Sequence, residues 1–444
     1  MEKMAFPQGF KWGVATAAYQ VEGFPLSDGA GPSIWHRFSH TFGTTRNGDT
    51  GDVACDHYHK YKEDVSIMRK LGIKAYRFSI AWPRIFPNGK GKLNLKGMDF
   101  YDRLVDELMT SNIEPFVTLY HWDLPAHLQD EGGWTNEDVA NWFADYADFV
   151  FQKLGDRVKH WITLNEPWVT AFIGHMFGIH APGMKDTYAA LKVVHNQLRA
   201  HSKAVKAFRD ENLSGKIGIT LSNHSQTPAS QNENDVMAAE VAHEWTNYPL
   251  FLNPIFKGEY PEHFYNAARE YFPRGYEKDM DDINVPIDFV GINYYSGNLV
   301  KADERAVFGV KNVERGVEKT DMGWEIYPQG LYEILTGVQN TYHPNEIFIT
   351  ENGAAFKDKL EDGKVHDEKR INYLKSHFEQ AHRALENGVN LKGYFVWSLM
   401  DNFEWAEGYS KRFGIVYVDY KTQKRVIKDS GYWYSEVISK NSIS

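Results

Sequence analysis

Short apolar segments recur along this chain, and each ends in polar or aromatic residues. Their length and their β-branched and aromatic content are typical of buried parallel strands, which show continuous apolar runs rather than strict alternation. Eight such segments are present, at residues 10–23, 74–82, 114–122, 160–167, 216–223, 288–295, 346–353 and 391–399. We expect one strand in each segment.

Stretches with helical periodicity lie between the expected strands. Apolar side chains recur about one turn apart in the clearest of them, residues 58–71, 98–111, 136–154 and 191–212. Repeated alternation of strand and helix predicts an α/β fold, a single (β/α)8 TIM barrel that forms one domain over residues 1–444. An open doubly wound sheet is the rival fold. It is disfavoured because Glu22-Gly23-Phe24-Pro25, after the first strand, is not a glycine-rich phosphate turn.

The barrel prediction locates the chemistry, because the active sites of such barrels lie at the C-terminal ends of the strands. Those ends hold two carboxylates, several amides, an imidazole and large aromatic side chains. The residues are Gln20, Arg77, His121, Trp122, Asn165, Glu166, Asn293, Tyr295, Glu351, Asn352 and Trp397. This set lacks a metal-ligand cluster, a Ser–His pair and a phosphate cradle, so we expect neither a metal nor a cofactor.

Glu166 and Glu351 stand in matched settings, each beside an asparagine at the end of an apolar run. A carboxylate in such a place is costly to desolvate unless its charge is used. Cleavage of a glycosidic bond needs one acid for the departing oxygen and one carboxylate for the oxocarbenium-like centre. Two unrelated surface glutamates are the alternative, and the matched pairing with asparagine argues against it. We therefore predict that these two residues face one sugar-sized site.

Composition and charge narrow the class of partner. The net charge of −10 argues against nucleic acid and anionic membrane surfaces, and no segment is apolar enough for a signal peptide or a membrane span. Cys55 is the only cysteine, which fits a reducing compartment, so we expect a cytoplasmic protein with Cys55 in its core. Aromatic residues make up 15% of the chain, and aromatic rings suit the C–H faces of a pyranose.

At Thr163-Leu164-Asn165-Glu166-Pro167 and Ile349-Thr350-Glu351-Asn352-Gly353 the chain resembles glycoside hydrolase family 1, the β-glucosidase family. The similarity runs from about Phe6 to Tyr434 and includes residues 120–125 and 397–405. It is greatest to the bacterial β-glucosidases. The resemblance implies that Glu166 is the general acid/base, that Glu351 is the nucleophile, and that the anomeric configuration is retained. Retention further implies carboxyl groups about 5–5.5 Å apart.

The resemblance also implies a set of sugar contacts, namely Gln20, His121, Asn165, Asn293, Tyr295, Trp397, Glu404 and Trp405. Arg77 is expected to hold the charge of Glu351 with the help of the Tyr295 hydroxyl. Tryptophans near Glu166, such as Trp168 and Trp122, are expected to raise its pKa by desolvation. Trp324 resembles an aglycone-side residue, with a packing role as the alternative.

Glu404 distinguishes two branches of the family. Relatives that cleave 6-phosphorylated sugars carry serine, lysine and tyrosine in this loop, whereas a glutamate repels phosphate and accepts hydrogen bonds from hydroxyls. Plant thioglucosidases carry glutamine in place of the acid, unlike Glu166. The expected activity is a retaining exo-β-glucosidase for cellobiose, short β-glucans and aryl glucosides, with a role in cellulose degradation. A transglycosylase, a preference for galactosides or fucosides, and a catalytically dead sugar-binding barrel are the alternatives.

Other features are interpreted as structural. Tyr294 alternates with Tyr295 along a strand and should point away from the site. His57 and His59 lack further ligands at metal-binding spacing. Residues 311–319 mix charges and are expected to form a solvated loop. The small-molecule substrate is the one expected partner, and a homo-oligomer is left open.

Overall fold

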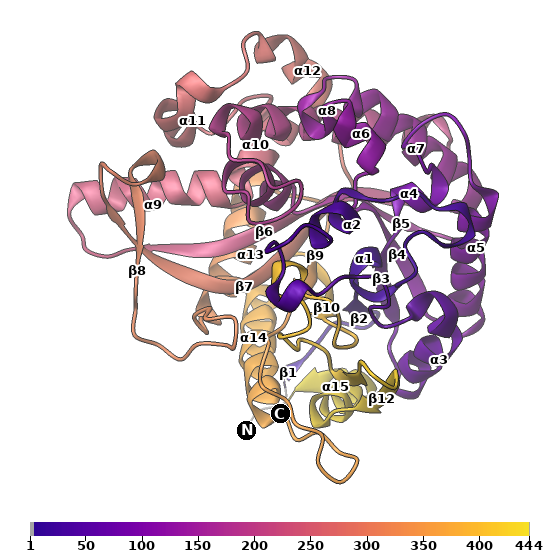
Figure 1. Ribbon diagram of the computed structural model, residues 1–444. Coiled ribbons are helices and arrows are strands. Elements are labelled where there is room, and N and C mark those ends of the chain that lie inside the picture. Colours follow the sequence, from indigo (N-terminus) through magenta and orange to yellow (C-terminus); the bar gives the residue numbers. More distant parts are fainter. Residues whose placement is uncertain (1–3, 444) are drawn as a thin grey trace.

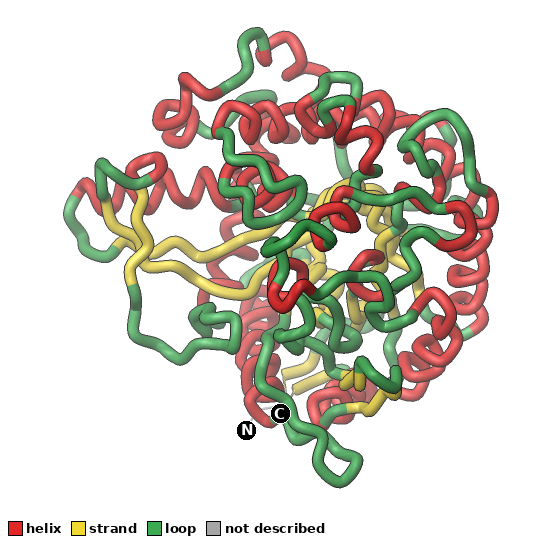
Figure 2. Tube along the Cα trace, in the orientation of Figure 1, coloured by secondary structure: helices red, strands yellow, loops and turns green. Residues whose placement is uncertain are grey.

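The computed structural model describes residues 4–443. Parallel strands at the centre pair in the order β2-β3-β4-β5-β6-β7-β9-β10, and β10 pairs with β2 to close a barrel. Figure 2 shows these strands in yellow, surrounded by helices. The strands are β2 (Lys11–Ala15), β3 (Ala75–Ser79), β4 (Glu114–Tyr120), β5 (His160–Asn165), β6 (Lys216–Pro228), β7 (Phe289–Ala302), β9 (Ile347–Asn352) and β10 (Leu391–Trp397). The predicted (β/α)8 barrel is confirmed.

Amphipathic helices cover the outside of the barrel (Figure 1). The longer ones are α3 (His57–Lys70), α5 (Leu95–Thr110), α7 (Val139–Leu154), α8 (Thr187–Asp210), α13 (Gln329–Tyr342), α14 (Glu368–Glu386) and α15 (Asp429–Lys440). In α5, Tyr101, Leu104 and Leu108 are buried at helical spacing, which is why the sequence predicted it. Shorter helices lie in the connections, namely α1 (Ala18–Val21), α2 (Ile34–Ser39), α4 (Trp82–Ile85) and α6 (Ala126–Asp130).

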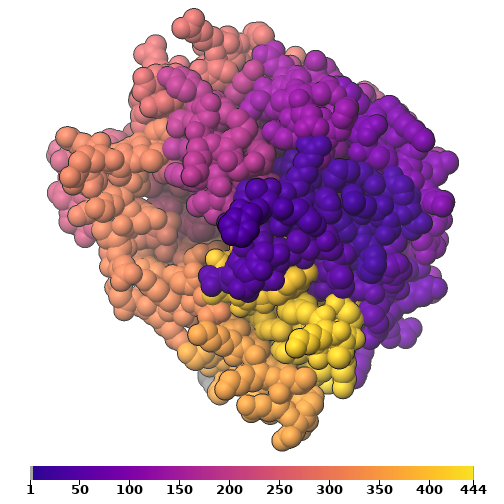
Figure 3. Space-filling view, in the orientation of Figure 1, coloured from indigo at the N-terminus to yellow at the C-terminus, as the bar shows by residue number. Residues whose placement is uncertain are grey.

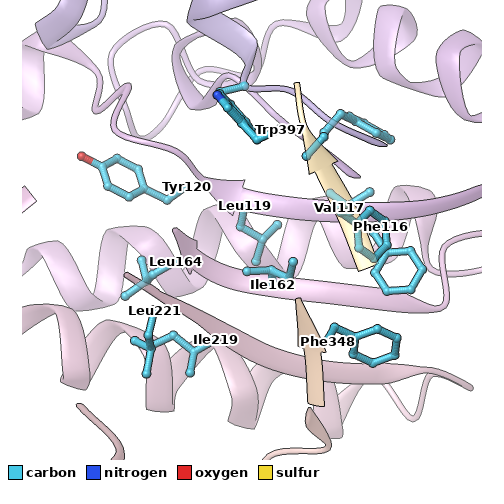
Figure 4. Packing of buried hydrophobic residues seen from close by; sticks show 14 of the residues in the cluster. Phe116, Val117, Leu119, Tyr120, Ile162, Leu164, Ile219, Leu221, Phe348 and Trp397 are labelled. Carbon is cyan, nitrogen blue, oxygen red and sulfur yellow. The ribbon is translucent and has the colours of Figure 1, made fainter. Parts of the chain in front are cut away.

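The barrel interior is packed with aromatic rings near the N-terminal ends of the strands. The Phe116 ring stacks on His160 with centroids 4.1 Å apart, and Phe348 contacts Phe116 edge-on at 5.4 Å. Figure 4 shows Phe116 and Phe348 at the opposite end of the strands from Tyr120. Such close packing leaves no room for a ligand at this end.

Two strands reach well past the barrel. The predicted segments 216–223 and 288–295 continue as β6 and β7, which stay paired as far as Pro228 and Val300. The antiparallel strand β8 (Val310–Val313) adds to β7, and α9 (Glu233–Thr246) packs on both long strands (Figure 1). The expectation of a solvated loop at residues 311–319 is therefore wrong at its start, because Lys311–Val313 pair with Leu299–Lys301.

Further helices join the two long strands: α10 (Pro249–Lys257), α11 (Glu262–Ala268) and α12 (Met280–Ile283). The short strand β1 (Met4–Ala5) pairs with β13 (Ser442–Ile443), and β11 (Val416–Asp419) forms a hairpin with β12 (Lys424–Ile427). Within residues 4–443, no helix combines the length and apolar character needed to cross a membrane. Cys55 is buried, as expected.

Buried charges hold the loop that follows β10. Asp401 accepts a hydrogen bond from Lys428 Nζ at 2.7 Å and one from Arg412 Nη1 at 2.5 Å. Lys428 Nζ also contacts Asp358 at 2.5 Å. Each of these charges has opposite-charge partners, which offset the cost of burial and fix the backbone around residues 398–414.

Candidate active site

A cavity of about 1160 Å³ opens at the C-terminal ends of the strands. Figure 3 shows this face hollowed between the indigo N-terminal loop and the orange segments near residue 300. Ten of the thirteen site residues expected from the sequence line the cavity: His121, Trp122, Glu166, Asn293, Tyr295, Trp324, Glu351, Trp397, Glu404 and Trp405. Gln20, Arg77 and Asn165 lie behind its wall and contact lining residues.

Glu351, on β9, is held by a cation and a hydroxyl. Arg77 Nη1 lies 2.6 Å from Glu351 Oε1, and the Tyr295 hydroxyl donates to Oε2 at 2.7 Å. Arg77 Nη1 also donates to the Thr350 carbonyl at 3.1 Å, which aims the guanidinium. Burial raises the pKa of Glu351, whereas the Arg77 charge and the Tyr295 hydrogen bond oppose that rise. These contacts favour a negative charge on this residue.

Glu166 has a different environment. It directly follows β5, and among residues 4–443 its side chain accepts one hydrogen bond, from Asn293 Nδ2 to Oε1 at 2.9 Å. Burial raises the pKa of Glu166 to about 8, and the nearby charge of Glu351 adds to the rise. Its φ of 45° lies in the left-handed region, where a glutamate is strained by about 1–3 kcal/mol. Desolvation by burial is the larger cause of this shift, in the direction expected from the sequence, and the contribution of Trp168 and Trp122 stays a prediction.

Two asparagine amides connect the strands that carry the glutamates. Asn165 Oδ1 accepts from Arg77 Nη2 at 2.5 Å and from Asn293 Nδ2 at 3.1 Å. Asn293 Oδ1 accepts from the Thr350 hydroxyl at 2.8 Å. The amide of Asn293 therefore cannot flip without losing hydrogen bonds on both sides. Its nitrogen hydrogen-bonds Glu166, and the same side chain lowers the pKa of Glu351.

His121 is neutral in this site. Burial and the Arg77 charge hold its pKa well below the usual range. Asn165 Nδ2 lies 3.0 Å from His121 Nε2, so the amide donates and the imidazole hydrogen is on Nδ1. Nδ1 is buried with no protein partner, as is Gln20 Oε1. A donor and an acceptor are therefore left unpaired by the protein near one wall of the cavity.

Glu404 and Trp405 lie together in the loop after β10. Gln20 Nε2 donates to Glu404 Oε2 at 3.2 Å. Burial raises the pKa of Glu404 to about 8, and the charge of Glu351 contributes. The Trp405 ring packs against Trp122 and Trp35, with centroids 4.6 Å away in both cases. These rings form an aromatic wall next to a carboxyl group.

The two remaining aromatic candidates lie on different sides of Glu351. Trp397 ends β10, and its ring lies 5.8 Å from that of His121 at an angle of 24°. A Cβ on Gly353 would lie 1.7 Å from the Trp397 carbonyl oxygen, which explains the glycine after Glu351-Asn352. Trp324 packs on Tyr295 at 5.4 Å and on Phe413 at 6.0 Å. Trp324 therefore both packs and lines the cavity.

Some lining residues were not found from the sequence. The cavity continues along the extended β6 and β7, where Asn223, His224, Gln226, Trp245 and Asn298 line it. Asn223 ended a predicted strand and could have been found from that position. Trp245 lies on α9, in a segment whose sequence shows no sign of a site. Tyr294, as expected, points elsewhere and donates to the Tyr327 carbonyl at 2.6 Å.

One group of possible metal ligands occurs among the described residues, and it lies outside the cavity. It consists of His36, His40 and Asp52. His57, discounted above, instead pairs with Asp64 at 2.8 Å. The cavity around Glu166 and Glu351 is lined by further carboxyl groups, amides, imidazoles and aromatic rings.

The model of glycosyl hydrolase family 1 matches residues 2–443, and the chain belongs to this family. It is 63% identical over 440 residues to the 1,4-β-D-glucan glucohydrolase of Thermotoga neapolitana, with 99% of both chains covered. It is 61% identical to β-glucosidase A of Thermotoga maritima over the full length of both chains. The solved family 1 β-glucosidase of Thermotoga maritima superposes with a TM-score of 0.99, covering all of both chains.

Proposed function

We propose that this glycosyl hydrolase is a retaining, exo-acting β-glucosidase that releases glucose from cellobiose, short β-glucans and aryl glucosides. The unlike surroundings of its two glutamates are the observation that carries the proposal. Glu351 has a cation and a hydroxyl donor, whereas Glu166 has a pKa raised to about 8. The names of the relatives support the substrate class. Residues 1–444 are proposed to act as one domain.

In the first step, Glu351 attacks the anomeric carbon while Glu166 gives its proton to the glycosidic oxygen. The bond from the anomeric carbon to that oxygen breaks, the aglycone leaves as an alcohol, and glucose is esterified to Glu351. Glu351 is ready as an anion because Arg77 and Tyr295 stabilise its charge. Glu166 is ready as an acid because burial and the Glu351 charge keep its proton on.

In the second step, the ester changes the electrostatics of the site. Glu351 is no longer charged, so one cause of the raised Glu166 pKa is removed and Glu166 ionises more easily. Glu166 then takes a proton from a water molecule, the oxygen of which attacks the anomeric carbon. The ester bond breaks, Glu351 regains its electron pair, and glucose leaves with its original β configuration.

The sugar would be bound by residues from most sides of the site. We propose that His121 Nδ1–H and Gln20 Oε1, both unpaired within the protein, bind ring hydroxyls. Asn165 and Asn293 would bind the 2-hydroxyl, where hydrogen bonds strengthen in the transition state. Trp397 would provide an aromatic floor, and Glu404 with Trp405 would contact the far hydroxyls.

The charges near Glu404 support an unphosphorylated sugar. Among the described lining residues, Arg305 and Lys311 are the Arg and Lys side chains, and both belong to the region beyond β7. The lining next to Glu404 is Trp405, Ala406 and Glu407. A phosphate here would face the carboxyl groups of Glu404 and Glu407, and the described lining beside them has no Arg or Lys side chain. The proposed order of preference is therefore glucoside far above 6-phosphoglucoside.

The aglycone would follow the extended part of the cavity. Its amides and imidazole on β6 and β7, with Trp245 and Trp168, suit a chain of further sugar units. This supports short β-glucans as substrates in addition to disaccharides.

The same groups could hold a sugar acceptor in place of water, so product analysis at high acceptor concentration is needed to separate hydrolysis from transglycosylation. Rates on β-galactosides and β-fucosides measure the tolerance at Glu404.

Azide rescue tests the roles of the two glutamates. In Glu351→Ala, azide can enter from the face that the nucleophile occupied, so we expect slow formation of α-glucosyl azide. In Glu166→Ala, a substrate with a good leaving group still forms the ester, and azide attacks it from the opposite face to give β-glucosyl azide. NMR of the products distinguishes the anomers. Exchange of the two outcomes would reverse the assignment, and normal turnover in Glu351→Ala would reject it.

A further inference from the structure

We propose that His36, His40 and Asp52 form a binding site for one divalent transition-metal ion of the class that includes Zn²⁺. The three residues lie in the long connection between β2 and β3, outside the active-site cavity. His36 is in α2, His40 follows its last residue, and Asp52 comes from the loop before α3. No metal was expected from the sequence, because the ends of the predicted strands hold no cluster of metal ligands, and His36, His40 and Asp52 lie outside those ends.

The distances among the three side chains suit a shared ion. His40 Nε2 lies 3.0 Å from Asp52 Oδ2, and His36 Nδ1 lies 3.5 Å from Asp52 Oδ1. Potential ligand atoms of all three residues lie within 4.8 Å of one another. Ligands about 2.0–2.1 Å from a tetrahedral Zn²⁺ are roughly 3.3 Å apart, so small side-chain rotations are sufficient to place an ion between them.

The hydrogen bonding of His40 prepares Nε2 as a ligand. His40 Nδ1 lies 2.7 Å from the His36 carbonyl oxygen, which can only accept, so Nδ1 carries a hydrogen. With Nδ1 directed at that carbonyl, Nε2 is the ring nitrogen that faces Asp52, 3.0 Å from its Oδ2. A backbone carbonyl bound to the far ring nitrogen is the usual way in which a metal-binding imidazole is oriented.

Two other atoms of the group contact each other at 3.5 Å but make no hydrogen bond to any of the described residues. His36 Nδ1 and Asp52 Oδ1 are both buried, and neither makes a hydrogen bond within the protein. Unpaired buried polar atoms are uncommon in folded proteins and call for an explanation such as a bound ion. Here two of them face each other. Two imidazoles and one carboxylate with open positions are a donor set that suits Zn²⁺, Ni²⁺ or Cu²⁺.

An ion at this site would stabilise a wall of the active site without taking part in catalysis. It would join α2 to the loop before α3. Trp35 of α2 packs on Trp405 with ring centroids 4.6 Å apart, and Tyr19 hydrogen-bonds Ser39 of α2 at 2.8 Å. The metal would thus restrain the support of the cavity lining.

Calorimetric titration of the full-length, tag-free chain with ZnCl₂ tests the proposal. We expect one Zn²⁺ per chain and an increase in Tm of about 3 °C when free Zn²⁺ is a hundred times the Kd. His40→Asn and the nearly isosteric Asp52→Asn should each weaken binding more than about tenfold. Both residues are partly exposed, so both variants should fold and keep glucosidase activity.

His59→Asn is the matched control. His59 pairs with Asp56 at 2.6 Å on a nearby surface but is not part of a three-ligand group, so this variant should bind Zn²⁺ normally. Glu166→Gln should also bind one equivalent, which separates this site from the active-site carboxyls. In Cu²⁺-loaded protein, electron paramagnetic resonance should report two nitrogen donors, reduced to one in His40→Asn. Absence of binding, or equal binding in His40→Asn and the parent chain, would overturn the proposal.

Discussion

The strands of this barrel begin among packed rings and end among charges. Near their N-terminal ends, Phe116, His160 and Phe348 fill the interior with ring centroids between 4.1 and 5.7 Å apart. At their C-terminal ends the same strands surround a cavity that contains Glu166 and Glu351. One end contributes close packing and therefore stability, whereas the other contains desolvated carboxyls and a strained backbone, which cost stability.

The difference shows how a single fold separates two demands. A packed interior fixes the positions of the strands. The side chains at the open end therefore do not depend only on contacts with one another to stay in place. Glu351 and Arg77 belong to β9 and β3, and the Phe348 ring on β9 packs against the Phe116 ring on β4, the strand that pairs with β3. Substitutions at the two ends should therefore change different properties, and three of them test this division.

The largest effect is expected at the packed end. Phe348→Ala removes a ring that is 2% exposed, and we expect it to lower the free energy of unfolding by about 3–5 kcal/mol. The value of kcat measured below the unfolding transition should stay near that of the parent chain. Denaturant unfolding combined with steady-state kinetics provides both numbers. Phe348→Leu is the control, since it keeps most of the volume and should cost less. A loss of kcat with unchanged stability would contradict the division.

A smaller effect is expected at the open end, with the opposite character. Tyr295→Phe deletes the hydroxyl that donates to Glu351 at 2.7 Å. A hydrogen bond to a charged group contributes about 1.5–3 kcal/mol, so kcat/KM should fall by about 10- to 100-fold while Tm changes little. Measurement on an aryl β-glucoside is sufficient.

The neighbouring tyrosine is the control for that variant. Tyr294 is on the opposite face of β7 and donates to the Tyr327 carbonyl instead. Tyr294→Phe should lower stability by about 1 kcal/mol and leave kcat/KM unchanged. If both variants lost the same activity, the hydroxyl of Tyr295 would have no special role at Glu351.

The smallest effect is expected on the pH dependence of stability, through the cost of desolvating the Glu404 carboxyl group. The pKa of Glu404 is raised to about 8 in the folded chain, against about 4.3 when unfolded. The folded state therefore binds the proton more tightly, and stability falls as pH rises from about 4.5 to 8. Glu404→Gln has no such proton, so its Tm should exceed that of the parent by roughly 2 °C at pH 9. The difference should vanish near pH 4.5.

Scanning calorimetry at the two pH values measures this difference. Glu407→Gln serves as the control, because Glu407 pairs with Arg46 at 2.9 Å near the surface. Its substitution should not raise Tm at pH 9. A Glu404→Gln variant that is less stable than the parent at pH 9 would show that the carboxylate is satisfied in its site, contrary to its raised pKa.

The sequence predicted the barrel and the residues at its open end because both follow from local patterns. Glu166 directly follows β5 and Glu351 lies in β9, and each of these strands is a short apolar run that can be recognised without knowledge of distant contacts. The packed end was not predicted in detail. Phe116, His160 and Phe348 come from three strands, and their contact depends on barrel closure.

The extension of β6 and β7 was missed for a related reason. Residues 224–228 are largely polar, which is typical of a loop, and they become a strand because β7 pairs with them. The His36–His40–Asp52 group escaped detection because a loop of the barrel brings Asp52 to α2. The features that the sequence did not predict are therefore those that depend on contacts between different segments of the chain.

The paired extension of β6 and β7 has a consequence for how this enzyme could diversify. The wall it forms is outside the barrel, held mainly by its own ladder, by β8 and by α9. Insertions or exchanges in this ribbon would reshape the half of the cavity in which the aglycone is proposed to bind, and would leave Glu166 and Glu351 where they are. If the proposed aglycone position is right, exchange of the ribbon between relatives should change the preferred length of the glucan without a change at Glu166 or Glu351.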